Sequence, residues 1–183
     1  ESSGSNWDYE TALKVAHALE EVDATWLEEP FVRGDVELHA RLRAETDIAI
    51  TGGEHQPPEV YHRYMQGEAF DIVQPHCGNF FTTLKKIAGM AELWGVECIF
   101  HGSHGMTVVG SLQIGGTIPS CRIQELVYTT PPLLPEDAWS PLNALVKTET
   151  LFTVKDGSVE IPQAPGLGIE IDEDALERYR VDK

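Results

Sequence analysis

The chain of 183 residues is poor in basic side chains and has no long apolar run. Its thirteen lysines and arginines stand against thirty acidic residues, for a formal net charge of −17. A nucleic-acid-binding protein needs basic surface to displace phosphate counterions, so this balance argues against nucleic acid as a partner. No segment approaches the roughly 20 apolar residues that cross a bilayer, and no signal-peptide pattern is present, so we expect no membrane partner either.

Cysteine is scarce as well. Cys77, Cys98 and Cys121 make an odd number and lack the CxxC spacing, which favours reduced thiols over a disulfide framework or a zinc site. We therefore expect a cytoplasmic protein. The rest of the composition, 42% hydrophobic and 8% aromatic, is ordinary for one globular domain. Because the sequence opens on Glu1 without methionine, we also expect it to be the later part of a longer chain.

Short apolar strands alternate with amphipathic helices along most of the sequence. Asp8 and Asp35 are placed to cap the first two helices, and Pro57-Pro58 begin the third, where proline needs no amide partner. The predicted helices cover residues 9–21, 35–45, 57–67 and 82–94, and the predicted strands cover 25–27, 47–51, 70–75, 96–101 and 122–127. This alternation is typical of βα units in a parallel sheet or barrel, so the predicted fold class is α/β.

The pattern changes towards the carboxyl end. A glycine-rich stretch over 102–116 precedes the last predicted strand, and prolines break the regularity beyond Tyr128. A short hairpin is predicted across 152–161 around Asp156-Gly157, and a final helical turn over 175–179.

Two of the predicted strands lead into acidic residues. Glu28 follows Trp26-Leu27, and Glu54 follows the apolar run that ends in Thr51-Gly52-Gly53. Adjacent parallel strands would bring both carboxylates to one rim, where they repel each other unless a cation lies between them. A hard divalent metal with oxygen ligands explains the pair. The alternative is that these are ordinary turn and capping acids.

Several short motifs occur in an order that resembles a known family. They are WLEEP at 26–30, TGGEH at 51–55, DIVQP at 71–75, HGS at 101–103, an acid at 125 and PGLGIEID at 165–172. Together they resemble the enolase superfamily, in its mandelate racemase/muconate lactonizing enzyme family. Within that family they are most similar to acid-sugar dehydratases of the rhamnonate type.

The resemblance implies the C-terminal portion of a (β/α)7β, TIM-like barrel, with the N-terminal capping domain and the first strands not present. Residues 1–128 would supply strands three to eight with their helices, and residues 129–183 would pack back on the barrel and the capping region. An incomplete barrel leaves two open strand edges, so we expect this stretch alone to be unstable. By analogy with such barrels, a homo-oligomer is expected.

The resemblance also implies one Mg²⁺ ion at the strand ends. Glu28 and Glu54 resemble the second and third acidic ligands of the family, one βα unit apart. The first ligand corresponds to Ser2 without a gap, or to Glu1 if the following loop carries one extra residue. Glu1 is the predicted ligand, since a serine is a poor third anionic ligand.

The chemistry implied is removal of a proton alpha to a carboxylate, with the metal stabilising the resulting enediolate. Loss of the β-hydroxyl would then give a 2-keto-3-deoxy acid, which makes a small sugar acid the expected substrate. A racemase or cycloisomerase of the same superfamily is one alternative. A barrel that has lost turnover and serves as a binding or scaffold protein is another.

Two histidines correspond to the acid/base positions of the family. His101 ends its predicted strand where the family places a catalytic histidine, although a lone histidine there is also compatible with a hydrogen-bonded core residue. The family normally pairs it with an aspartate one strand earlier, whereas this sequence has His76. Adjacent imidazoles disfavour each other's protonation. His101 could thus act as the acid for the leaving hydroxyl, or His76 could be the base.

Two further residues are candidates for contact with substrate. Glu125 corresponds to an acid on the last barrel strand that hydrogen-bonds the substrate, or else it is a solvated rim acid. His55, next to Glu54, is predicted to contact substrate, or else to cap the following turn.

Overall fold

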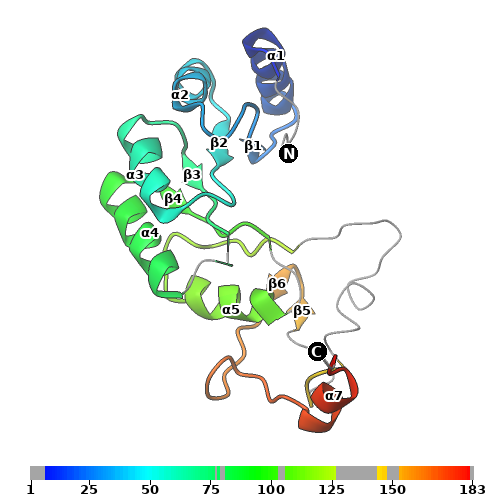
Figure 1. The fold of residues 1–183 in the computed structure, drawn as a ribbon. Helices are drawn as coiled ribbons and strands as arrows, with labels where there is room; N and C mark the ends of the chain where they lie inside the picture. The colour runs from blue at the N-terminus through cyan, green and yellow to red at the C-terminus, as the bar shows by residue number, and fades with distance from the viewer. Residues whose placement is uncertain are drawn as a thin grey trace.

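The computed structural model describes residues 7–76, 78, 81–102, 106–126, 144–147 and 153–181 (Figure 1). Four helix and strand pairs come first: α1 Tyr9–Glu20, β1 Trp26–Glu28, α2 Val36–Glu45, β2 Ala49–Gly52, α3 Pro58–Gln66, β3 Ile72–Val73, α4 Phe81–Trp94 and β4 Glu97–Cys98. They are followed by α5 Met106–Gly115, the strands β5 Val154–Lys155 and β6 Ser158–Val159, and α7 Glu173–Arg178.

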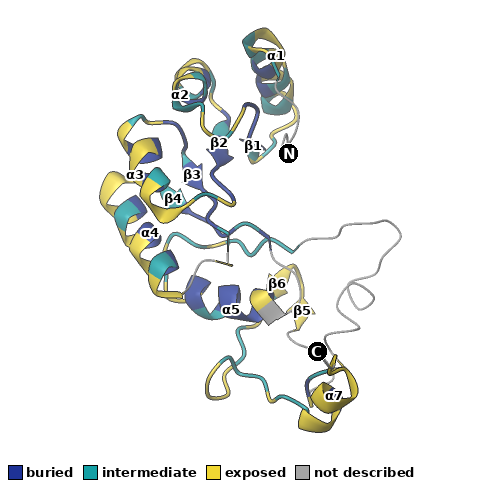
Figure 2. Cartoon of the chain, viewed as in Figure 1, coloured by how far each residue is buried: buried dark blue, intermediate teal, exposed yellow. Residues whose placement is uncertain are grey.

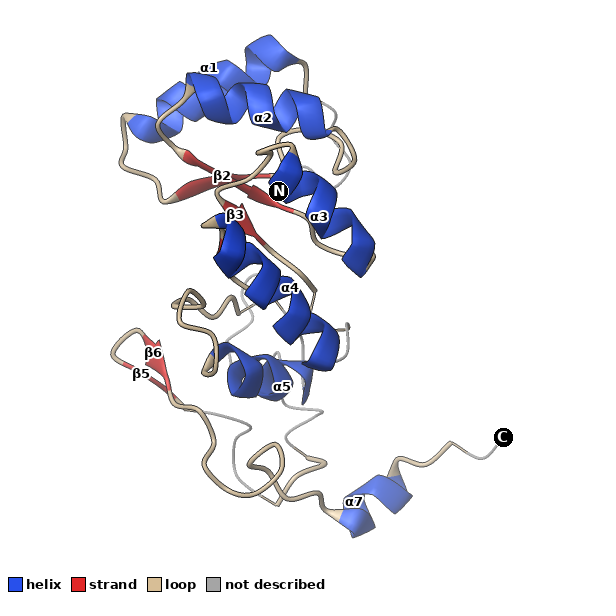
Figure 3. Ribbon diagram, turned by 90° about the vertical axis from the view of Figure 1, so that its left-hand side faces the viewer, coloured by secondary structure: helices blue, strands red, loops and turns tan. Residues whose placement is uncertain are grey.

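The four strands β1 to β4 form one parallel sheet in chain order. Leu27 pairs with Ile50, Thr51 with Ile72, and the sheet continues from β3 to β4 in the same direction. Helices α1 to α4 lie along the outer side of this curved row of strands (Figures 1 and 3). The sheet therefore has the arrangement of successive βα units, and the predicted α/β class is confirmed.

The local signals that start the helices act as predicted. The Asp8 carboxylate accepts the N–H of Thr11 at 2.8 Å, and the Asp35 carboxylate accepts the N–H of Leu38 at 3.0 Å. Each satisfies an amide that the first turn of a helix leaves without a backbone partner. The four predicted helices end within one to two residues of their predicted bounds. Strand β1 has its predicted length but is shifted by one residue, whereas β2, β3 and β4 are shorter than predicted.

The main core lies between these helices and the sheet. Its largest fully buried side chains include Tyr61, Tyr64 and Phe100, and strand residues such as Ile50 complete it. The outer faces of the helices are exposed (Figure 2). Among the described residues, no helix is long and apolar enough to cross a membrane.

The glycine-rich stretch after the sheet contains a helix that the sequence analysis missed. Helix α5 runs from Met106 to Gly115, with Val108, Val109 and Leu112 buried. It contains no charged residue, so it lacks the charged stripe by which an amphipathic helix is recognised. The glycines at 110 and 115 further weaken the helical pattern.

The strand predicted over 122–127 is not found in the described residues, which reach Leu126. Residues 121–125 have no strand assignment, and Leu126 makes only a single bridge. The amide Nε2 of Gln124 donates to the carbonyl oxygen of Glu125 at 2.9 Å. The Gln124 side chain thus occupies the Glu125 carbonyl oxygen, which would accept a hydrogen bond from a neighbouring strand in a sheet. This local side-chain bond competes with strand pairing, and it is our physical reason why the predicted strand does not form.

The predicted hairpin and last helical turn are confirmed as β5–β6 and α7, and both lie apart from the sheet, beyond α5 (Figures 1 and 3). Asp156 and Gly157 both have positive φ, as a tight hairpin turn requires. The predicted division at residue 128 falls among residues 127–143, outside the described residues. The same holds for Glu1 and Ser2.

Candidate active site

Four of the predicted site residues lie at one edge of the sheet. Glu28 ends β1, and Glu54 follows β2 after Gly53. His76 and His101 follow β3 and β4, and the two residues form a parallel bridge that extends the pairing of these strands. Because all four strands run in the same direction, the carboxyl ends that carry these side chains meet at the same rim. The spacing of the strands predicted the meeting of Glu28 and Glu54, whereas His76 and His101 were predicted from the resemblance to the family.

His101 lies between two carboxylates. Its Nδ1 is 2.7 Å from Oε2 of Glu54 and 3.8 Å from Oε2 of Glu125. Glu54 is only 2% exposed. The same Oε2 of Glu125 accepts the N–H of Gly102 at 2.8 Å, which fixes this acid beside the histidine. A histidine held in this way has one defined ring nitrogen directed to an acid, as an acid/base residue requires.

Three imidazole rings form a cluster at this rim. The ring centroids of His55 and His76 are 4.3 Å apart, those of His55 and His101 5.3 Å, and those of His76 and His101 5.6 Å. The Nδ1 of His76 accepts the N–H of Gly78 at 2.9 Å. A neutral His76 ring therefore carries its proton on Nε2.

Glu28 is joined to the same edge through an intervening side chain. Gln74, which follows β3 and is 1% exposed, donates from Nε2 to Oε2 of Glu28 at 3.2 Å. The amide therefore holds the Glu28 carboxylate in a defined orientation. Glu28 and Glu54 end adjacent paired strands, and both offer the hard oxygen atoms that Mg²⁺ prefers. The two described residues of the predicted ligand set therefore fit this metal by their chemistry.

Arg33 and Glu29 are site residues that the sequence analysis missed. Glu29 is completely buried and accepts the N–H groups of Gly53 and Glu54 at 3.0 and 3.3 Å. The Nε of Arg33 donates to Oε2 of Glu29 at 2.5 Å, and its Nη2 pairs with Oε1 of Glu54. One guanidinium thus compensates two buried carboxylates, which would otherwise be costly to bury.

A signal for this arrangement is present in the sequence. Two adjacent acids stand at the end of a predicted strand, so a partner of opposite charge is expected nearby for any of them that is buried. Glu29 has a positive φ of 43°, a backbone conformation that is strained for a residue with a side chain. An arginine four residues after a buried acid is the candidate counter-ion.

The turn that carries Glu54 is packed too closely for larger residues. A Cβ at Gly52 would lie 2.9 Å from Cγ of Glu29, and Gly53 has a φ of 99°. The Tyr61 hydroxyl donates to the Gly53 carbonyl at 2.5 Å, and burial raises the pKa of this phenol, so it remains a neutral donor. The backbone that positions Glu54 is therefore fixed from both sides.

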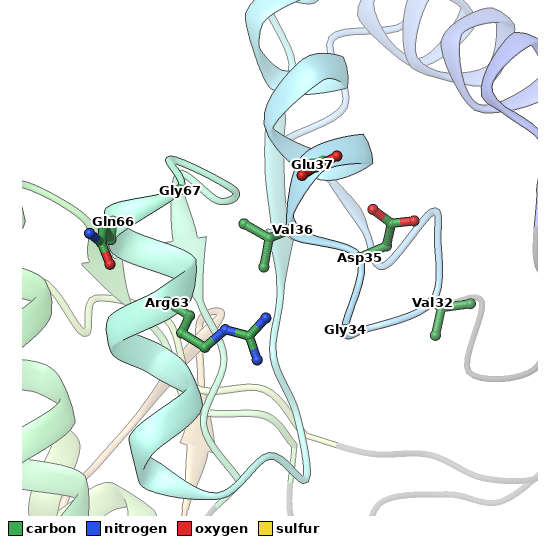
Figure 4. Close-up of a pocket in the computed structure, with 8 residues that line it drawn as sticks. All are labelled: Val32, Gly34, Asp35, Val36, Glu37, Arg63, Gln66 and Gly67. Carbon is green, nitrogen blue, oxygen red and sulfur yellow. The ribbon is translucent and has the colours of Figure 1, made fainter.

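A separate hollow lies between the start of α2 and the end of α3, lined by Val32, Gly34, Asp35, Val36, Glu37, Arg63, Gln66 and Gly67 (Figure 4). None of these residues belongs to the histidine cluster. The hollow is open and carries charges of both signs, so it offers no defined ligand chemistry.

The sequence is similar to known proteins along nearly its whole length. The profile of the family described as "Enolase C-terminal domain-like" matches residues 3–175. D-galactarolactone cycloisomerase of Agrobacterium fabrum is 35% identical over 163 residues, which are 85% of this chain and 42% of that protein. D-gluconate dehydratase of Thermoproteus tenax is 27% identical over 93% of this chain and 33% of its own length.

The fold is similar to solved structures of the same kind. The crystal structure of L-talarate/galactarate dehydratase from Salmonella typhimurium LT2, liganded with Mg and L-lyxarohydroxamate, superimposes with a TM-score of 0.74 at 26% identity. The match covers 95% of this chain and 41% of that one. The chain thus spans less than half the length of these relatives, which are dehydratases and cycloisomerases. It belongs to the enolase C-terminal domain-like family, in the mandelate racemase/muconate lactonizing enzyme branch of the enolase superfamily.

Proposed function

We propose that the protein is a Mg²⁺-dependent acid-sugar dehydratase, a hydro-lyase that acts on a small sugar-acid carboxylate. The observation that carries this proposal is the placement of His101 between Glu54 and Glu125 at the carboxyl ends of the parallel strands. The dehydratases among the relatives support the reaction class.

Glu28 and Glu54 are the proposed metal ligands, together with Glu1, which lies outside the described residues. When bound, Mg²⁺ supplies positive charge opposite the substrate carboxylate as negative charge develops on it. Gln74 holds the Glu28 carboxylate in place by its 3.2 Å hydrogen bond. Arg33 and the Gly52-Gly53 turn hold Glu54.

His101 is the proposed acid/base residue. The Nδ1 of His101 faces the Glu54 carboxylate at 2.7 Å, and a neutral ring that carries its proton on this nitrogen has its lone pair on Nε2. That nitrogen takes the proton alpha to the substrate carboxylate, and the electrons of the broken C–H bond form the enediolate. The C–O bond at the β-carbon then breaks, and the hydroxyl leaves as water with the proton from His101. The remaining enol tautomerises to the 2-keto-3-deoxy acid.

Glu54 therefore takes over the orientation of His101 that an aspartate provides in the family. The proposed role of His76 is that of a proton donor through Nε2–H, because its Nδ1 accepts the Gly78 amide. His55 and Glu125 are proposed to hydrogen-bond substrate hydroxyls. Glu125 is half-buried and lies next to the reacting histidine, as such a contact requires.

A cycloisomerase is the second candidate. It is supported by the 35% identity to D-galactarolactone cycloisomerase. The same proton transfer at His101 would serve it, but no water would be released. A barrel without turnover is the third candidate, because His76 replaces the family's aspartate.

The test is an assay of the purified protein with Mg²⁺ over a set of sugar acids and their lactones. A 2-keto-3-deoxy product that is lost in His101→Asn and kept in His17→Asn is the expected result, since His17 lies exposed on α1. Isomerisation of a lactone without a keto acid would favour the cycloisomerase. Mg²⁺ binding without any product would favour the scaffold.

A further inference from the structure

We propose that Glu54, His55 and His101 form a second divalent-cation site, with two imidazole nitrogens and one carboxylate oxygen, that selects Zn²⁺, Co²⁺ or Ni²⁺ over Mg²⁺. One ligand atom from each of the three residues lies within 4.8 Å of the other two. The inference goes beyond the proposed dehydratase. It shares Glu54 with the proposed Mg²⁺ site but needs neither Glu28 nor turnover.

The backbone directs the His55 ring to this point at an energetic cost. His55 has a φ of 53°, in the left-handed region that a residue with a side chain rarely adopts. Such a conformation is strained and persists where the surroundings impose it. Its ring lies edge-on to His101, with the planes at 66°, so two imidazoles from different strands converge beside one buried acid.

The separations suit a metal of this kind. Bonds of about 2.0–2.1 Å in a tetrahedral site place neighbouring ligand atoms roughly 3.3 Å apart. The Nδ1 of His101 and the Oε2 of Glu54 are 2.7 Å apart, so a small outward movement would admit the ion between them. The other oxygen of Glu54 pairs with Arg33, so this site receives one carboxylate oxygen.

The ligand set decides which cation binds. Mg²⁺ prefers six oxygen ligands, whereas imidazole nitrogen suits Zn²⁺, Co²⁺ and Ni²⁺. Three protein ligands leave a position open for water or a substrate oxygen, as in catalytic metal sites. The ring of His76 packs on His55 at 4.3 Å and restricts the orientation of that ligand.

The test is a Co²⁺ titration of the protein without added Mg²⁺, read by visible absorption and calorimetry. We expect the protein to bind one Co²⁺ ion, and we expect its visible absorption to be that of a four- or five-coordinate ion. His55→Asn should weaken its affinity by about 100-fold or more, because loss of an outer partner of a ligand alone costs 10–100-fold. His17→Asn is the matched control, since His17 also lies beside an acid, with Nδ1 2.9 Å from Glu20.

A third variant separates this site from the proposed function. Glu28→Gln should remove Mg²⁺ binding and leave the Co²⁺ absorption unchanged. Co²⁺ affinity that survives His55→Asn, or that falls with Glu28→Gln, would overturn the proposal. So would a thiolate charge-transfer band. NMR of the Co²⁺-loaded, unmutated protein should show two paramagnetically shifted imidazole N–H signals, one from each histidine ligand. Their absence would also overturn the proposal, and this result does not depend on whether the variants fold.

Discussion

The sheet region, residues 7–102, and the region from 106 onward are built in different ways. In the sheet region, parallel strands and four covering helices enclose a large buried core. Beyond it, a second small cluster of buried residues consists of Val109 and Val146, with Leu167, Ile169 and Ile171 packed around it. The hairpin and α7 are mostly exposed (Figure 2).

This difference explains where the chemistry lies. Glu28, Glu54, His76 and His101 all stand at strand ends of the sheet region, whose backbone ladder and core fix their positions. Glu125 is the contribution of the second region, and it reaches the site through the Gly102 amide. The reacting groups are therefore held rigidly, while the second region adds a contact to them.

The largest difference in stability effect between the two regions is expected when the buried ion pairs of Arg33 are removed. Arg33→Met should destabilise the protein by about 3–5 kcal/mol, because it leaves the carboxylates of Glu29 and Glu54 buried without their counter-ion. Urea unfolding measures this effect. Added Mg²⁺ should restore part of the lost stability, because the cation replaces the missing positive charge.

The control for this change lies in the second region. Arg180 pairs with Glu177 at 3.3 Å, and both side chains are largely exposed. Arg180→Met should change the free energy of unfolding little, since water screens the pair. Equal effects of the two substitutions would contradict the assignment of Arg33 as a buried counter-ion.

Shortening a side chain in each region tests the same comparison between the sheet region and the second region. Leu84→Ala, at a completely buried position of α4, should cost about 2–5 kcal/mol. Val154→Ala, at a half-exposed position of β5, should cost about 0.5 kcal/mol or less. Urea unfolding measures both losses of stability, as shifts of the denaturation midpoint with an unchanged dependence of the unfolding free energy on urea concentration. A larger loss from Val154→Ala would show that the hairpin packs on the core.

The smallest effect is expected from pH. Burial lowers the pKa of His39 below its usual 6.5, and its Nδ1 is bonded to the Asp35 carbonyl oxygen at 2.7 Å. Between the folded and unfolded pKa values, the unfolded state binds more protons, so stability falls as the pH drops below about 6.5.

His39→Gln should flatten this part of the profile of unfolding free energy against pH. A profile that does not respond to His39→Gln would show that other groups cause the loss of stability in acid.

Much of the sheet region could be predicted because its signals are local. Asp8 and Asp35 are capping residues at the start of amphipathic stripes, and Glu28 and Glu54 directly follow apolar runs. The motifs from residue 26 to residue 172 then identified the family, which the similarity over residues 3–175 confirms. The residues at the strand ends were correctly placed on one rim, while their catalytic and ligand roles stay predictions.

The remaining features depend on contacts between distant segments. Arg33 stands in a short loop without periodicity, and its pairing with Glu54 appears only when β1 and β2 are side by side. Helix α5 contains no charged residue, so its sequence shows no charged face opposite an apolar one. The Gln124 amide donates to the Glu125 carbonyl oxygen, where a neighbouring strand would otherwise bind. The spacing of residues in the sequence does not reveal such a bond.

The most direct measurement is calorimetric Mg²⁺ binding by the unmutated protein, by Glu54→Gln and by Glu170→Gln. Glu170 is an exposed acid paired with Lys147 in the second region, so its variant is the matched control. We predict that Mg²⁺ binds the unmutated protein and Glu170→Gln alike, and that binding is lost in Glu54→Gln. Equal Mg²⁺ affinity in all three proteins would contradict a metal site at the strand ends.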